Sequence, residues 1–214
     1  MMLSLLMNGQ VLTFVLLLLT IIVSLSCHEF GHAWSAKLYG DDTAQKQGRL
    51  TLNPIAHIDP VGLLMIMIIG FGWARPVPTD PRNFTSFWAS LVVAAAGPLA
   101  NLILAFLAVN IFSFAAANGF AFVESQSGQS FFFLFTYINL LLMLFNLIPL
   151  GPLDGHYILP YFLPRNASRL YRDFNQRYGA FAVLGLLLLS YAGLPIFTWL
   201  RAAAQWLMGA LVIL

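Results

Sequence analysis

The sequence predicts an all-α polytopic membrane protein of about five transmembrane helices, with a short re-entrant or interfacial β-element between the first and second spans. The 214 residues are 60% hydrophobic and only 8% charged, whereas a soluble domain carries roughly a quarter charged residues. Several apolar runs also approach or exceed the length of about 20 residues that a spanning helix needs. Ionisable groups are costly at bilayer depth, so each of the few present requires an explanation.

The apolar runs divide the chain into elements within one membrane-embedded domain, 1–214. The predicted order is a helix at 11–38, the β-element at 48–78, a helix at 87–117, a helix at 131–155 that ends in an Asp-Gly pair, and two C-terminal helices in 178–214. Pro195 separates the last two, because proline interrupts helical hydrogen bonding.

The segment 48–78 is too short and too rich in turns for an ordinary span. Its apolar part, Val61–Phe71, has 11 residues and would rise only about 16 Å as a helix. Upstream, Arg49 to Leu52 alternates polar and apolar residues as a strand does. We expect an element that enters the membrane and returns, with an exposed edge that pairs with an extended substrate.

The distribution of basic residues supports this topology. If 61–71 returns to its own side, nine of the ten Lys and Arg share one face, with only Arg201 opposite. Basic loops mark the cytoplasmic side, so the N-terminus is expected outside. The net charge of +2 is too small to imply a nucleic-acid partner. The only cysteine, Cys27, excludes a disulfide within the chain.

The first predicted helix contains an H-E-x-x-H motif. His28 and His32 are four residues apart, so both imidazoles lie on one helix face and can bind one Zn²⁺. Glu29 can take a proton from a water molecule at such a metal. The alternative is a polar cluster whose members are satisfied by neighbouring helices.

Zinc requires a third protein ligand. Asp154 is our choice, because Pro149, Gly151 and Pro152 end the third span and let the chain turn a carboxylate inward. It could instead cap a following helix. The other candidates are three residues of predicted loops and one of the outer loop: His57, Asp59, His156 and Glu124.

Three motifs together resemble the site-2 proteases, which are intramembrane zinc metalloproteases. They are His28-Glu29-Phe30-Gly31-His32, Gly97-Pro98-Leu99-Ala100-Asn101, and Asn146-x-x-Pro149-x-x-x-Leu153-Asp154-Gly155. The resemblance implies one Zn²⁺ held by His28, His32 and Asp154, with Glu29 as the general base. It also implies cleavage of transmembrane helices of substrate proteins near the cytoplasmic face of a prokaryotic cell membrane. The chain resembles a compact form without a PDZ or CBS domain.

Four further residues are candidates for binding substrate or supporting the site. Asn101 is a buried amide that can orient a ligand, and Asn146 can donate to an oxyanion or hold the substrate backbone. Gly70 and Gly72 lie at the end of the short apolar segment Val61–Phe71, before the turn-rich residues 75–78. Two other functions remain possible: an inactive metal-binding protein that docks helices, and a transporter or haem carrier that uses the four histidines.

Overall fold

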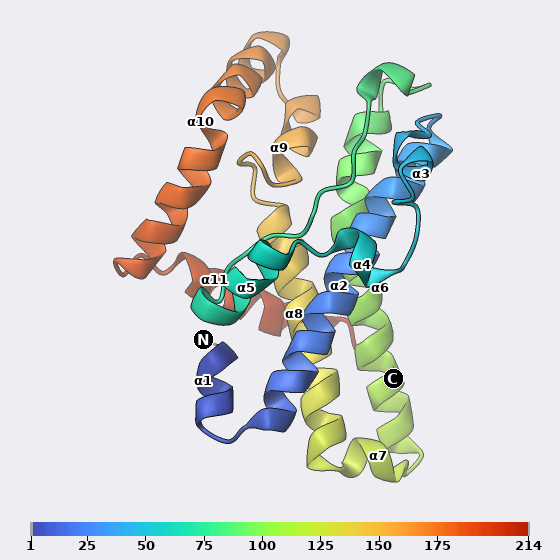
Figure 1. The fold of residues 1–214 in the computed structure, drawn as a ribbon, viewed down its shortest axis with the longest axis vertical. Helices are drawn as coiled ribbons and strands as arrows, with labels where there is room; N and C mark the ends of the chain where they lie inside the picture. The colour runs from blue at the N-terminus through green and yellow to red at the C-terminus, as the bar shows by residue number, and fades with distance from the viewer. Residues whose placement is uncertain (1, 214) are drawn as a thin grey trace.

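The computed structural model describes residues 2–213, and three long helices form its centre (Figure 1). They are α2 (Val11–Leu38), α6 (Ala89–Ala117) and α8 (Gln126–Asn146), and each packs against the other two. In the described part of the chain, these are the helices long and apolar enough to cross a membrane individually. Their core contains Ala105, Leu140 and Met143 together with Ala204 of the last helix.

The helices α2 and α6 approach closely at small residues. A Cβ atom added at Gly31 of α2 would lie 2.7 Å from the carbonyl oxygen of Ala96 in α6. Small residues allow such backbone contact between membrane helices. Pro98 lies inside α6 and supplies no N–H to the preceding turn.

The expected count of five spans is wrong at the C-terminal end. The sequence predicted two spans within 178–214, but α10 begins at Arg165 (Arg165–Tyr191) and α11 (Ile196–Ala210) has only 15 residues. A helix of that length rises about 22 Å, less than the hydrocarbon thickness. The two helices meet at a bend of 89° and could form one broken span. The described chain therefore has three spanning candidates, or up to four.

The expected β-element is also wrong, because the described residues contain no strand. The region 39–88 instead forms α3 (Thr43–Lys46), α4 (Pro54–His57), α5 (Pro60–Ile69) and a 3₁₀ turn, η1 (Pro81–Asn83). The helices α4 and α5 begin where a side chain caps the first turn: Asn53 accepts from the Ile55 amide and Asp59 from the Gly62 amide.

Residues 71–80 run as an extended chain without strand partners. Pro76 and Pro78 have no N–H for a β-ladder. Gly70 ends α5 in the left-handed region with φ +81°, after which the chain reverses. A Cβ at Gly72 would then collide with the carbonyl of Gly62. The segment therefore returns along α5 with backbone packed against backbone.

The third long helix differs from the predicted range 131–155. The side chain of Ser125 caps α8 by accepting from the Gly128 amide, so the helix begins at Gln126 and ends at Asn146. The turn at 147–154 leads into α9 (Gly155–Ile158) and a 3₁₀ turn, η2 (Leu159–Phe162). Two short helices complete the fold, α1 (Met2–Met7) and α7 (Ala121–Glu124).

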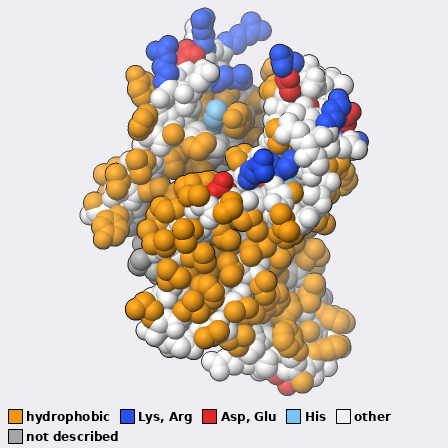
Figure 2. Space-filling model, in the orientation of Figure 1, with side chains coloured by type: hydrophobic (Ala, Val, Ile, Leu, Met, Phe, Trp, Pro, Cys, Tyr) orange, Lys and Arg blue, Asp and Glu red, His pale blue; other side chains and the backbone are white. Residues whose placement is uncertain are grey.

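The two ends of the molecule differ in charge. Helices α3 and α9 and the start of α10 lie at one end, and α7 lies at the other (Figure 1). Figure 2 shows most of the visible Lys and Arg side chains at the first end and a smaller group nearer the middle, while hydrophobic side chains cover most of the remaining face. This distribution is typical of a protein embedded in a bilayer.

Candidate metal centre

The two histidines of α2 direct the same ring nitrogen toward one point. The Nε2 atoms of His28 and His32 lie 3.1 Å apart. The α6 backbone passes directly over them at Gly97, where an added Cβ would lie 2.6 Å from Nε2 of His28 and would also overlap the ring of His32. Only glycine leaves room for both imidazoles at this crossing.

Asp154 completes the cluster from the turn after α8. Its Oδ2 lies 3.2 Å from Nε2 of His28, and its Oδ1 lies 3.3 Å from Nε2 of His32. Gly155 allows this turn to fold back on the end of α8, because a Cβ there would lie 2.6 Å from the carbonyl oxygen of Ile148. The amide of Gly151 is held by Oδ1 of Asn175 in α10, at 2.7 Å.

Hydrogen bonds at the opposite ring nitrogens determine which tautomer each histidine adopts. Nδ1 of His28 lies 2.6 Å from Oδ1 of Asn101, and Nδ1 of His32 lies 2.7 Å from the carbonyl oxygen of Val93. A carbonyl can only accept, so Nδ1 of His32 donates. Nε2 of a neutral imidazole is then the lone-pair atom, as a metal ligand requires.

The orientation of Asn101 is fixed in turn by two acceptors. Its Nδ2 donates to the carbonyl of Ser24 at 3.1 Å and to Oδ1 of Asn139 at 2.9 Å. The remaining atom, Oδ1, therefore faces His28 and accepts from it. Asn101 thus lies where a residue that orients a ligand would be expected.

The three ligand atoms fit a zinc ion. Two imidazole lone pairs and a carboxylate within 3.3 Å of one another would repel without a cation or proton between them. Tetrahedral zinc with bonds of about 2.0–2.1 Å separates its ligand atoms by about 3.3 Å. The two Nε2 atoms are close to this separation, and each lies at a similar distance from a different oxygen of Asp154; one ligand atom from each residue lies within 4.8 Å of the others. In the described chain, His28, His32 and Asp154 form the group of His, Cys, Asp and Glu residues that could hold a metal.

Glu29 lies next to this cluster and is itself buried, with 8% of its surface exposed. One carboxylate oxygen, Oε2, accepts from the backbone amide of Val77 at 2.9 Å. The extended segment 71–80 thus lies against the carboxylate that the motif predicts to be a base.

The side chains of the other candidate ligands make their contacts outside the metal cluster. Nε2 of His57 lies 2.7 Å from the carbonyl of Thr51, Asp59 caps α5, and the ring of His156 stacks on Tyr157. Glu124 is in α7, at the opposite end of the molecule (Figure 1).

Unlike Asn101, the other three candidate residues, Asn146, Gly70 and Gly72, make no hydrogen bond to the metal cluster in the described structure. The side-chain amide of Asn146 donates to the carbonyl of Leu142, one turn back in its own helix. Gly70 and Gly72 shape the return of the chain along α5, as described above.

The structure adds supporting groups that the sequence reasoning missed: Arg49, Asn139 and the backbone of Val93 and Val77. Arg49 is buried and contacts the extended segment through two carbonyls. Asn139 was detectable as an amide side chain within the apolar part of α8. The two backbone groups carry no side-chain signal.

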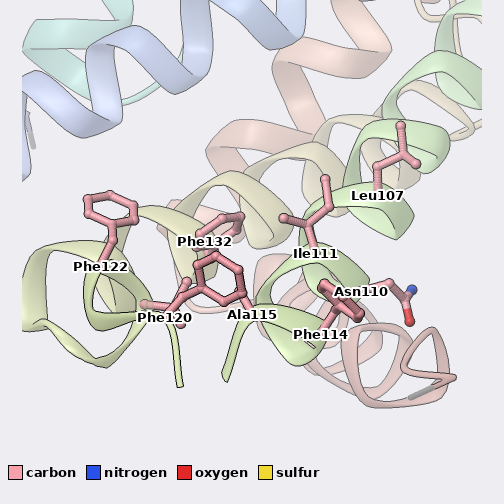
Figure 3. Close-up of a pocket in the computed structure, with 9 residues that line it drawn as sticks. Leu107, Asn110, Ile111, Phe114, Ala115, Phe120, Phe122 and Phe132 are labelled. Carbon is pink, nitrogen blue, oxygen red and sulfur yellow. The ribbon is translucent and has the colours of Figure 1, made fainter. Parts of the chain in front are cut away.

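An apolar cavity lies apart from the metal cluster. It measures about 540 Å³ and lies among α6, α7 and α8. Figure 3 shows the aromatic rings of Phe120, Phe122 and Phe132 around it. Its polar side chain, Asn110, is already bonded to the backbone of Leu211 and Ile213. The cavity thus offers no free polar group for catalysis.

Comparisons with known proteins agree on one family. The sequence profile described as Peptidase family M50 matches residues 16–190. "Putative zinc metalloprotease YwhC" of Bacillus subtilis is 47% identical over 151 residues, which are 69% of each chain. "Putative zinc metalloprotease Rip2" of Mycolicibacterium smegmatis is 31% identical over 67% of this chain and 55% of its own length. Rip2 of Mycobacterium tuberculosis H37Rv is 32% identical over 73% of this chain and 61% of its own length.

This chain therefore spans less than two thirds of the Rip2 proteins. No solved structure matches it. The apolar helices and the family match together indicate an integral membrane protein. The family profile covers most of the sequence, and YwhC of Bacillus subtilis is nearly half identical to the matched part of this chain. The chain therefore belongs to peptidase family M50, the family of the site-2 proteases.

Proposed function

We propose that this protein is a zinc metalloprotease that hydrolyses peptide bonds of transmembrane segments within the membrane, near its cytoplasmic face. The observation that carries the proposal is the convergence of two imidazole Nε2 atoms and one carboxylate within 3.3 Å. The next residue after His28 is a buried glutamate, Glu29. The names of the relatives support both the metal and the reaction.

His28, His32 and Asp154 would hold the zinc ion. When bound, zinc supplies a Lewis acid that lowers the pKa of water and polarises a carbonyl group. Glu29 takes a proton from the attacking water and later gives it to the leaving amine. Its anchored oxygen, Oε2, is occupied by the Val77 amide, so the other oxygen, Oε1, is the one available for this proton.

The burial of the cluster supports a substrate that is itself in the membrane. His28 is ten residues before the end of α2 at Leu38, a rise of about 15 Å along a helix. The basic side chains lie at that same end of the molecule (Figure 2), and basic loops face the cytoplasm. The cluster would therefore meet transmembrane helices of substrate proteins in the cytoplasmic half of the bilayer, with the N-terminus outside.

A substrate helix must be unwound before hydrolysis, because its carbonyls are already hydrogen-bonded. The substrate was expected to pair with an exposed edge of the element 48–78. In the extended part of this region two backbone amides are already bonded within the chain: the Arg75 amide donates to the carbonyl of His57, and the Val77 amide donates to Glu29. Strand addition at these positions is thus not part of the proposal.

Cleavage of a transmembrane reporter in proteoliposomes tests the function, with zinc content measured on the same preparations. Wild type should bind one zinc per chain and cut the reporter. Glu29→Gln should retain zinc and lose activity by about 10²–10⁴-fold, the usual contribution of a general base. A wild type that holds zinc but cuts no member of a panel of helices would instead indicate the inactive, helix-docking alternative.

A further inference from the structure

A buried arginine lies close to the proposed base without contacting it directly. Arg49 is only 6% exposed, although charged side chains are rarely buried without compensation. Its Nη2 donates to the carbonyl of Arg75 at 2.6 Å and its Nη1 to the carbonyl of Pro76 at 3.3 Å, while Nε has no partner. No hydrogen bond joins Arg49 to Glu29 in the described structure.

The link between the two residues is a single peptide group. The carbonyl of Pro76 accepts from Arg49, and the N–H of the same peptide, which belongs to Val77, donates to Oε2 of Glu29 at 2.9 Å. A peptide is planar and its C=O and N–H point in opposite directions, so fixing one end fixes the other. A hydrogen bond at the carbonyl also polarises the N–H toward its acceptor.

Charge complementarity strengthens this arrangement. Burial lowers the pKa of the Arg49 guanidinium, the negative charge of Glu29 raises it, and the positive charge of Arg75 lowers it further. Glu29 is thus the charge that compensates the buried cation. A cation retained only for packing would be replaceable by an apolar side chain at little cost. Arg49 instead holds two successive peptides, Arg75–Pro76 and Pro76–Val77, and the second of these carries the N–H that binds the base.

We propose that Arg49 is a positioning residue that acts through the Pro76–Val77 peptide to hold the carboxylate of Glu29 in the orientation that proton transfer requires. This inference rests on the proposed function for the role of Glu29. These contacts are made within the chain itself, so the orientation of the base does not depend on a group supplied by the substrate.

Proline substitution tests the peptide link, because it deletes one backbone donor. Val77→Pro removes the N–H that binds Glu29, and Thr79→Pro places a proline two residues later in the same extended segment, at an exposed residue whose amide has no recorded acceptor. We expect Val77→Pro to lower kcat by at least about 10-fold, with zinc content and KM unchanged. Thr79→Pro should retain wild-type kcat.

Substitution of Arg49 tests the other end of the link. Arg49→Gln should lower kcat like Val77→Pro, and Arg49→Lys should recover part of the loss, because an ammonium keeps the charge but not the two-pronged contact. Residue-resolved hydrogen exchange gives a readout independent of activity. The Val77 amide should exchange faster in Arg49→Gln and in Glu29→Ala than in wild type.

These results separate the inference from the proposed function. If wild type cuts no substrate, the proposed function fails, and the exchange of the Val77 amide still decides whether Arg49 orients Glu29. Equal loss of kcat in Val77→Pro and Thr79→Pro, loss of zinc from Arg49→Gln, or unchanged Val77 exchange in that variant would each overturn the inference.

Discussion

The Nδ1 atom of His28 lies 2.6 Å from Oδ1 of Asn101, and this contact joins the two motif helices α2 and α6 at the metal cluster. Asn101 is completely buried and its own amide is committed to Ser24 and Asn139. It therefore cannot rotate to offer a donor to His28 without losing two hydrogen bonds. The tautomer of the proposed ligand is set by three helices together.

Removal of this acceptor should weaken zinc binding. Asn101→Ala leaves Nδ1 of His28 without its acceptor, and loss of such partners typically costs 10–100-fold in metal affinity. Competition with a chromophoric chelator measures the change. Asn118→Ala is the control, because Asn118 is an exposed residue that bonds only its own helix at Phe114. Equal zinc affinities for the two variants would contradict the role of Asn101.

A methyl group at Gly97 should displace the histidines. Gly97→Ala places a carbon 2.6 Å from Nε2 of His28, well inside van der Waals contact, so α6 or the two rings must move. We expect zinc affinity and cleavage to fall by at least about 10-fold. Gly185→Ala in α10 is the matched control, since open space surrounds Gly185 and alanine favours the helix there. Full zinc content in Gly97→Ala would contradict this prediction, because it would mean that α2 and α6 can accommodate a methyl group where they cross.

Asp41 should stabilise the fold through its charge. It is completely buried after the end of α2, where Oδ2 accepts from the Asp80 amide at 2.7 Å and Oδ1 accepts from Thr43 and Asn83. Asp41→Asn turns one of these oxygens into a donor facing another donor. Hydrogen bonds to charged groups contribute about 1.5–3 kcal/mol each, so we expect the free energy of unfolding in detergent to fall by about 2–4 kcal/mol at pH 7.

The same carboxylate predicts a pH dependence. Burial raises the pKa of Asp41, but hydrogen bonds from Thr43, Asn83 and the Asp80 amide outweigh it and hold the pKa below its usual value. The stabilisation is then complete above the unfolded pKa of about 3.9 and is lost as pH falls through the lower folded value. The difference in unfolding temperature between wild type and Asp41→Asn should be constant from pH 8 to about pH 5 and should become smaller below about pH 4. If this temperature difference already became smaller near neutral pH, a group other than Asp41 would be responsible for the pH dependence.

Much of the metal cluster was predictable because its signals are local or rest on helix-breaking residues. The spacing of His28 and His32 fixes their shared helix face, and Pro149 and Pro152 end the helix before Asp154. In the structure, one carboxylate oxygen of Asp154 lies beside each of the two Nε2 atoms. By contrast, the contact of Glu29 with Val77 joins residues 48 positions apart through a backbone amide, and no side-chain pattern reveals such a contact.

The two errors in the fold have different physical causes. The alternation at Arg49–Leu52 was interpreted as a strand, but Asn53 and Asp59 supply helix caps directly afterwards, and short-range capping outweighs four residues of alternation. At the C-terminus, hydropathy alone placed a span after Arg177, whereas α10 begins at Arg165 because a polar helical face extends an apolar helix without a break.

The return of the chain along α5 provides the last test, because two neighbouring glycines act by different means. Gly70 has φ +81° but open space around its Cβ position, whereas Gly72 would collide with the carbonyl of Gly62. Gly70→Ala should lower the free energy of unfolding only by the strain of a left-handed residue, about 1–2 kcal/mol. Gly119 in the connection between α6 and α7 has a similar φ of +68°, so Gly119→Ala should lower the free energy of unfolding by the same amount.

Gly72→Ala must push the extended segment away from α5 and hence shift Val77 relative to Glu29. We therefore expect cleavage to fall by about 10-fold or more in Gly72→Ala, with zinc content unchanged, and much less in Gly70→Ala. Equal activities in the two variants would mean that the position of this segment does not control the base.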